Sequence, residues 1–427
     1  MPSDPSVPTC AYPALPAPSP AASAACAPAA RHVAGSAGYR RTSAAMFVGG
    51  FTTFAMLYGL QPLMPLFSAE FGASPAAASG VVSAATGTMA AMLIPASLLA
   101  DRYGRKPLMN AALFAGAVLM LAAAFAHDFA ELVWLRALMG VALAGLPAVA
   151  MAYLAEEIDP ASLGRSMGLY IAGNALGGMS GRLAASLLAD ALGWRWAVGA
   201  LGVFGLAAAL LFWHSLPASR QFRARRVRLA ALAAGARGHF ADAGLPWLFL
   251  VGFVLMGCMV SLYNYLGYRL GDAPFSLSHS AQGAVFGLYV VGMAASAWAG
   301  RLADRWGRRH VLWWMVAAMA AGLALTVAPS LWVIVAGVAL FTFGFFGAHA
   351  VASSWVGRRV SEHRALASAL YLTAFYLGAS TLGSASGLMW HAGGWFGVAA
   401  LLGAALLVCL AAALKLRTLA PLPHAPR

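Results

Sequence analysis

Twelve stretches of this sequence are apolar and long enough to cross a lipid bilayer, and no other feature constrains the fold as strongly. A helix needs about 20 mainly apolar residues to span the hydrocarbon core. The stretches lie near 44–66, 75–99, 108–126, 131–154, 164–188, 196–214, 245–268, 280–302, 311–327, 331–353, 366–389 and 394–414. Hydrophobic residues form 61% of the chain and charged residues only 9%, too few to cover such a protein in water. We therefore predict an all-α, multi-pass membrane protein with twelve transmembrane helices.

Basic residues fall mostly on one side of this predicted array. With twelve crossings, the two termini and alternate loops share a side, and that side holds 23 of the 27 Lys and Arg residues. The other four are Arg136, Arg182, Arg195 and Arg269. Loops rich in Lys and Arg face the cytoplasm, so we predict a bacterial-type inner (plasma) membrane protein with both termini cytoplasmic. The net charge of +14 then reflects orientation in the bilayer, and we expect no nucleic-acid partner.

The longest inner loop divides the chain into two halves. We expect a disordered cytoplasmic tail at 1–43, a six-helix bundle at 44–214, a basic cytoplasmic linker at 215–244, a second six-helix bundle at 245–415, and a cytoplasmic tail at 416–427. The basic charge of the linker can also contact anionic lipid headgroups.

One short phrase, Leu-Ala-Asp-Arg-x-Gly-Arg, occurs at 99–105 and again at 302–308, so the halves look related. Internal duplication is common in transporters that move one half against the other. Each glycine permits a tight turn, and each aspartate can accept hydrogen bonds from a helix N-terminus or pair with an arginine. The alternative is an ordinary turn in a basic loop. We expect a gating role for Asp101, Arg102, Gly104, Arg105, Asp304, Arg305, Gly307 and Arg308.

The two aspartates are predicted to contact the opposite half. Asp101 should contact the start of the predicted helix at 366–389, with Arg364 as one candidate partner and the helix N-terminus as another. Asp304 should make the mirror contact near Arg165. Both contacts would hold the cytoplasmic side closed.

At this phrase the chain resembles the major facilitator superfamily. The family signature is Gly-x-Leu-Ala-Asp-Arg-x-Gly-Arg-Lys/Arg between helices 2 and 3, often with a degraded copy between helices 8 and 9. Here the second copy, at 300–309, is the fuller one, and Ser97 stands at the leading glycine position of the first. The resemblance covers 44–415. It implies two pseudo-symmetric six-helix bundles that work as a secondary transporter by alternating access.

Two more segments extend the resemblance. Residues 132–140 look like the family's helix-4 motif, an arginine followed four residues later by glycine, with Met139 in place of the usual glutamine. Residues 173–181 are similar to the helix-5 motif of drug/proton antiporters. Gly178 stands at the expected proline and Arg182 at the final glycine.

Two phrases at 58–65 and 264–269 resemble the branch known as arabinose-efflux-type permeases. The resemblances together imply proton-coupled efflux of a small-molecule substrate, by a protein that we expect to be a monomer in the lipid bilayer. An uptake symporter or facilitator of the same fold stays open, as does a polytopic membrane enzyme or channel. None of the 13 acidic residues lies near the middle of a predicted span, so the sequence shows no evident carboxylate to carry a proton.

Two arginines fall inside apolar runs. A guanidinium in the hydrocarbon is costly unless it is paired or hydrated, so Arg136 and Arg182 should face the protein interior or a watery cavity, or reach outward to the interface. The resemblance implicates Arg136, at the family's helix-4 arginine, in proton coupling. We take Arg136 and Arg182 as the coupling candidates.

Small and polar residues complete the candidate site. Gly173, Gly177 and Gly181 are spaced by four, so they should let another helix approach closely. Polar and aromatic residues at middle depths suit a mostly apolar pocket with a few polar groups, although each alone also suits ordinary packing. They are Tyr58, Gln61, Tyr170, Asn174, Tyr263, Asn264, Tyr289, Tyr371 and Tyr376. We find no metal-binding spacing, nucleophile motif or phosphate-binding loop, and expect no metal, cofactor or enzyme activity.

Overall fold

Helices account for the regular structure of this chain. The computed structural model describes residues 31–222, 229–360 and 363–419. Within these residues every element is a helix, apart from one isolated β-bridge between His32 and Ile158. The all-α prediction is confirmed.

The N-terminal half contains six crossing segments, several of them built from two or three consecutive helices. They are α2 (Ala37–Tyr58) with η1 (Gln61–Leu63) and α3 (Met64–Phe71); α4 (Pro75–Ala78) with α5 (Gly80–Tyr103); α6 (Arg105–Ala123); α7 (Phe129–Leu143) with α8 (Pro147–Glu157); α9 (Pro160–Leu192); and α10 (Trp194–Ser215).

The C-terminal half has the same plan. Its segments are α12 (Leu245–Gly271); α13 (His279–Ala284) with η2 (Val285–Leu288) and α14 (Tyr289–Trp306); α15 (Arg308–Leu325); α16 (Leu331–Arg359); and α17 (Arg364–Thr418). The backbone of α17 leaves helical geometry at Gly393 and Gly394, so this 55-residue element makes two crossings.

Nine continuous stretches of the described chain are apolar and long enough to span a membrane by length and composition. Of the described helices with 18 residues or more, those outside that set are α9, which carries two arginines, and α15, which begins with two. Together with the two crossings of α17, they complete the twelve segments that the sequence predicts.

Proline explains why the first crossing is broken. Pro62 has no N–H to continue the helical ladder, and α2 ends four residues before it, at Tyr58. The chain passes through η1 and resumes as α3. The carbonyl groups at the end of α2 therefore lack their usual helical partners.

Two predicted boundaries differ from the structure. α2 begins at Ala37, so residues 37–43 are helical and not part of a disordered tail; Ser36 caps this helix by accepting a hydrogen bond from the Tyr39 N–H at 3.1 Å. Of the predicted tails at 1–43 and 416–427, residues 1–30 and 420–427 lie outside the described residues, and α17 continues to Thr418. The predicted linker contains a helix, α11 (Leu229–Ala241).

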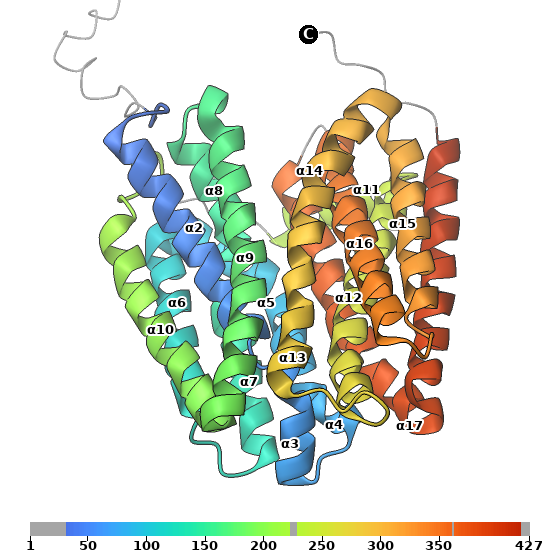
Figure 1. Ribbon diagram of the computed structural model, residues 1–427. Coiled ribbons are helices and arrows are strands. Elements are labelled where there is room, and N and C mark those ends of the chain that lie inside the picture. The colour runs from blue at the N-terminus through green and yellow to red at the C-terminus, as the bar shows by residue number, and fades with distance from the viewer. Residues whose placement is uncertain (1–30, 223–228, 361–362, 420–427) are drawn as a thin grey trace, which may run out of the picture.

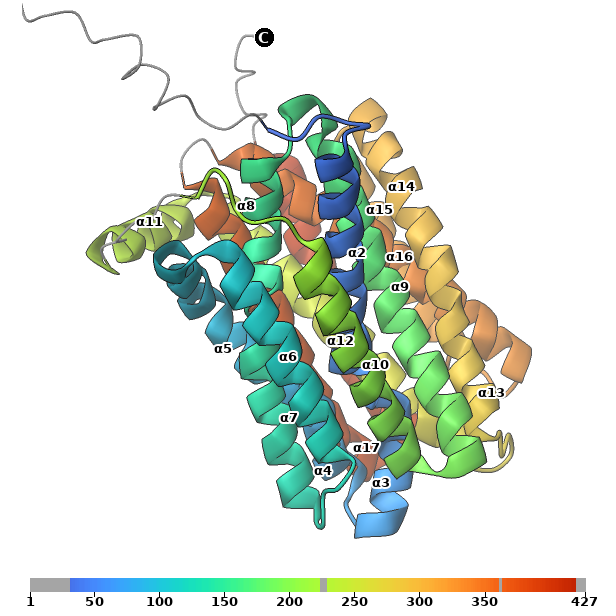
Figure 2. The ribbon, with the colours of Figure 1, turned by 90° about the vertical axis from the view of Figure 1, so that its left-hand side faces the viewer.

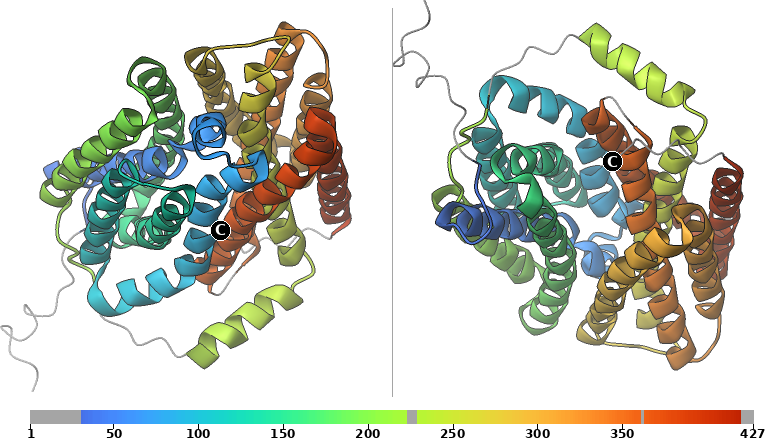
Figure 3. Two further views of the ribbon diagram at one scale, coloured as in Figure 1. Left: turned by 90° about the horizontal axis from the view of Figure 1, so that it is seen from below. Right: turned by 90° about the horizontal axis from the view of Figure 1, so that it is seen from above.

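Figure 1 shows the two bundles side by side, with the start of α2 and the end of α17 at the same end of the molecule. We call this the terminal end. α11 lies beside this end (Figure 2) and outside both bundles when the molecule is viewed along its length (Figure 3). An ion pair between Asp242 and Arg359, at 2.5 Å, fixes the chain just after α11 to the C-terminal half.

The hydrogen bonds between the two halves lie away from the terminal end. Across the described residues they join Gln61 to Val260 and Asn264, Ser68 to Tyr268, Ser83 to Ser380, and Asp190 to Ser280. At the terminal end, the ion pairs of both repeated turns stay within one half. The halves are therefore fastened together on the side opposite the termini.

Candidate functional site

Hydrogen bonds run from Arg182 of α9 through Gln61 to Asn264 of α12, and we call this set of contacts the relay. It crosses the interface where the two halves are hydrogen-bonded to each other, which we call the seam. The Arg182 side chain is 2% exposed. Its Nε donates to Oε1 of Gln61 at 2.6 Å, and its Nη1 donates to the carbonyl of Gly178 at 2.6 Å. Gln61 in turn donates from Nε2 to Oδ1 of Asn264 at 2.7 Å and to the carbonyl of Val260 at 3.2 Å. One amide thus connects α9 of the first half with α12 of the second.

Aromatic rings surround the Arg182 guanidinium. Its Cζ lies 4.4 Å from the ring centroid of Tyr58, 5.2 Å from that of Phe286 and 5.1 Å from that of Tyr289. The ring of Tyr263 stacks on Phe286 with centroids 4.9 Å apart. Cations bind favourably to ring faces at these distances. Both halves contribute rings, so the charge sits between them.

Two polar groups beside the relay have no hydrogen-bond partner within the described chain: the hydroxyl of Tyr58 and Nδ2 of Asn264. Both residues are buried. A small pocket adjoins Asn264 and is lined in part by Gln61, Tyr263 and Phe286. Buried donors without acceptors are uncommon in folded proteins, so this is a place where a bound molecule would find ready hydrogen bonds.

The structure divides the predicted cavity residues into groups. Tyr58, Gln61, Tyr263, Asn264 and Tyr289 gather around Arg182.

Tyr170 and Asn174 lie instead against α2, where a Cβ on Gly50 would be 2.2 Å from the Asn174 amide oxygen. Tyr371 bonds to Nδ1 of His349 at 2.9 Å inside the C-terminal half. Tyr376 packs edge-on against Phe375 nearby.

Phe286 also belongs to the group around Arg182, although it is not among the residues predicted from the sequence. Only its position three residues before Tyr289 in a predicted helix could have pointed to it.

The second buried arginine, Arg136 of α7, bonds to main-chain carbonyls. It is 0% exposed. Its Nε donates to the carbonyl of Val81 at 2.9 Å, its Nη1 to that of Met56 at 2.9 Å, and its Nη2 to that of Leu57. Met56 and Leu57 are in the last turn of α2, where the break at Pro62 leaves carbonyls without helical partners. Arg136 therefore caps a broken helix.

The helix-5 glycines lie against α2. A Cβ added at Gly173 would lie 2.5 Å from the carbonyl oxygen of Phe47, and one at Gly177 would lie 2.0 Å from that of Phe51. At Gly181 it would lie 2.6 Å from the Cα of Ala55. Such distances exclude a side chain. The two backbones therefore touch along three successive turns of α9.

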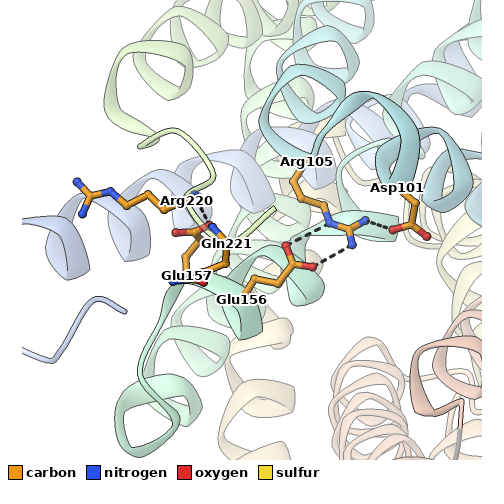
Figure 4. A network of polar contacts seen from close by, with 6 residues as sticks. All are labelled: Asp101, Arg105, Glu156, Glu157, Arg220 and Gln221. Atoms are coloured by element: carbon orange, nitrogen blue, oxygen red, sulfur yellow. Dashed lines mark hydrogen bonds and ion pairs between the residues drawn. The ribbon is translucent and has the colours of Figure 1, made fainter. Parts of the chain in front are cut away.

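The first repeated turn forms a network within the N-terminal half (Figure 4). Arg105 pairs with Asp101 at 2.6 Å and with Glu156 of α8 at 2.9 Å. The neighbouring Glu157 accepts hydrogen bonds from the N–H groups of Arg220 and Gln221, at 2.7 and 3.0 Å. Helices α5, α6 and α8 and the start of the linker are thus tied together.

The second repeated turn contains a similar ion pair, but its aspartate is more exposed to solvent. Asp304 pairs with Arg308 at 2.9 Å and approaches Arg358 at 3.9 Å. Arg102 and Arg305 are exposed.

The glycines of both turns have backbone angles that L side chains rarely adopt, with φ of +106° at Gly104 and +86° at Gly307. In this structure Asp101 pairs with Arg105, and Arg364 donates to the carbonyl of Val360. The contact between Asp101 and Arg364 stays a prediction for another conformation, as does that of Asp304 with the Arg165 region.

Comparison with known proteins identifies the family. The model of the Major Facilitator Superfamily matches residues 46–273 and 270–427. The chain belongs to the Major Facilitator Superfamily. Among related Major Facilitator Superfamily proteins, the uncharacterized MFS-type transporter YybF of Bacillus subtilis (strain 168) is 45% identical over 87% of this chain and 92% of its own. The inner membrane transport protein YnfM of Escherichia coli (strain K12) is 43% identical over 87% and 89%.

A solved structure agrees on the fold. The bacterial homolog of the human lysosomal transporter Spinster, in an inward-facing and unoccupied conformation, has a TM-score of 0.73 at 16% identity over 90% of this chain and 97% of that one. The protein is a multi-pass membrane transporter of small molecules, in a family that is not enzymatic. Its bacterial relatives fit the predicted inner-membrane location.

Proposed function

We propose that this transporter exports a small molecule in exchange for protons, by alternating access between two six-helix bundles, and that its terminal end faces the cytoplasm. The observation that carries the proposal is the position of the seam. The hydrogen bonds between the halves in the described chain all lie opposite the terminal end. With basic loops inside, this is the state closed to the outside, one of the two that alternating access requires.

The direction of transport rests on helix 5. The glycine segment at 173–181 is similar to the motif of drug/proton antiporters, and its glycines bring α9 into backbone contact with α2. A segment of this kind permits α9 to shift against α2 without side chains interlocking. The motif similarity supports export, and the close contact permits the movement that transport in either direction requires.

A facilitator or an uptake symporter is the second candidate, and one observation favours a facilitator. Every acidic residue in the described chain lies in a loop or within three residues of a helix end. The middle of the membrane therefore holds no carboxylate among these residues to bind and release a proton.

Inverted membrane vesicles separate these functions. Their lumen is acidified by respiration, a pH-sensitive dye reports the gradient, and a panel of compounds is added outside. An exporter driven by protons will release luminal protons when a transported compound is added, because the compound enters as protons leave. A facilitator will move the compound with no pH change, and an uptake symporter will not dissipate the gradient. Vesicles without the protein are the control.

A further inference from the structure

Within the described residues, no carboxylate pairs with the positive charge of Arg182. The ion pairs of the described chain involve neither Arg182 nor Arg136. Arg182 is ten residues from the end of α9 at Leu192, about 15 Å along the helix, so it does not reach the aqueous interface. Its partners are an amide oxygen, a carbonyl and ring faces, all of them neutral. An unpaired guanidinium at this depth favours an anion beside it.

Arg182 also has a guanidinium nitrogen without an acceptor in the described chain, unlike Arg136. All three guanidinium nitrogens of Arg136 donate to carbonyls. Arg182 uses Nε and Nη1, and Nη2 has no acceptor within the described residues. The hydroxyl of Tyr58, whose ring lies against the guanidinium, and Nδ2 of Asn264, at the far end of the relay, are also without partners. Nη2 of Arg182, the Tyr58 hydroxyl and the positive charge therefore meet at one place. Nδ2 of Asn264 lies beyond the glutamine of the relay, beside Gly383 of α17.

We propose that Arg182 binds the carboxylate of the transported molecule, and that this molecule is a small organic acid with an aromatic ring. A carboxylate accepts hydrogen bonds on both oxygens, and an arginine fork fits it well. The guanidinium lies over the rings of Phe286 and Tyr289, so a ligand that reaches it also meets aromatic surface, against which an aromatic ring packs favourably.

Binding at this position would touch both halves of the transporter. Arg182 belongs to α9, while Asn264 belongs to α12. In this structure the Gln61 amide accepts a hydrogen bond from Nε of Arg182 and donates one to Oδ1 of Asn264. A carboxylate that takes hydrogen bonds from Arg182 competes directly with Gln61. The relay that fastens the seam is then loosened by the substrate itself.

The test measures binding, so it does not depend on transport. The full-length protein in lipid nanodiscs is titrated with benzoate, salicylate and cinnamate, each beside its own uncharged amide. We expect each acid to bind at least about 10-fold more tightly than its amide, since a charged hydrogen bond is lost with the charge. Benzylamine, with the same ring and a positive charge, should not bind.

Three variants locate the site. Arg182→Gln should weaken acid binding by about 10- to 100-fold, and Arg182→Lys should restore part of it because the charge remains. Arg269→Gln is the matched control, since Arg269 also lies over a ring, that of Trp395 at 5.2 Å, but outside the seam. Size-exclusion profiles verify that each variant is folded. If Arg182→Gln misfolds, Arg182→Lys and the acid–amide pairs still decide the proposal.

The outcomes separate this site from the proposed function on which it rests. Equal binding of acids and amides, or unchanged acid binding in Arg182→Gln, overturns the carboxylate site even if another compound drives proton release in vesicles. Tight, Arg182-dependent acid binding with no proton movement in vesicles upholds the site and overturns proton exchange.

Discussion

Arg136 and Arg182 are both buried guanidinium groups of the N-terminal half, but their neighbours differ in kind. Arg136 donates to three main-chain carbonyls, two of them at the end of one broken helix. Arg182 donates to a side-chain amide that itself reaches into the other half, and it keeps one nitrogen free of acceptors in the described chain. Main-chain carbonyls move only when a helix moves, whereas an amide side chain can rotate. The contacts of Arg136 therefore stabilise the fold, whereas those of Arg182 can be exchanged for contacts with another molecule.

This comparison changes what we expect of Arg136. Its resemblance to the family's helix-4 arginine predicts a role in coupling, and that role stays a prediction. Its contacts, however, give it a structural task first, because hydrocarbon offers no other donors to the carbonyls of Met56 and Leu57.

The largest effect is expected for Arg136→Ala. It leaves buried carbonyls unpaired at about 1–3 kcal/mol each, so the purified protein should lose most of its thermal stability. Fluorescence-detected size exclusion after heating measures this. Arg195→Ala, at a half-exposed arginine paired with Glu70, is the control and should change little. Parental stability in Arg136→Ala together with lost proton coupling would reverse the structural assignment.

The next effect concerns the helix that carries Arg182. A methyl group at Gly177 would meet the carbonyl oxygen of Phe51 at 2.0 Å, so Gly177→Ala should force α9 away from α2. Overpacking of this kind costs about 1–3 kcal/mol. Gly168→Ala, on the same helix with nothing within 4 Å of the added atom, should be neutral or slightly stabilising. The same heating assay compares them, and equal stability of both variants would count against the close approach.

Gln61→Leu tests the exchangeable relay itself. It removes the amide that links Arg182 to Asn264 while keeping a similar volume. The side opposite the termini should open more often, by about 10-fold for a loss of roughly 1.4 kcal/mol. A single cysteine at Ala76, which lies against Gly387 of the other half and takes no part in the hydrogen bonds between the halves, is labelled by an impermeant reagent and reports this opening. Ser219→Ala, at the terminal end, is the control. Unchanged labelling in Gln61→Leu would show that the relay does not fasten the seam.

The smallest effect is expected for the ion pair between Asp242 and Arg359, which lies outside the membrane. This pair serves as a comparison for the two buried arginines, Arg136 and Arg182. Burial opposes ionisation of Asp242, but hydrogen bonds from Arg359 and from the N–H groups of Gly244 and Leu245 outweigh it and hold the pKa below its usual value. The resulting stability is complete above about pH 4 and is lost as pH falls through the lower folded pKa. Asp242→Asn should therefore reduce the acid sensitivity of the melting temperature. An identical pH profile in both proteins would contradict this.

The fold could be predicted because apolar length and loop charge act over whole segments. The start of α2 was missed because Arg40 and Arg41 look like loop residues, although the helix around them is partly buried. The pairing of Asp101 with Arg105 was within reach, since the two are four residues apart on one helix face. The cap formed by Arg136 could not be predicted from the sequence. Its acceptors are main-chain carbonyls, which every residue carries, so no sequence pattern identifies them.

The cap on α2 also sets an order of synthesis. Met56 and Leu57 precede Arg136 by 80 and 79 residues, so the first crossing enters the membrane long before its cap is made. Its carbonyls must rely on water or on a temporary neighbour until α7 arrives. The first crossing, which contains α2, is therefore completed only when the fourth crossing, which contains α7, has been made. A ribosome that stalls between them leaves a chain whose earliest segment is still unfinished.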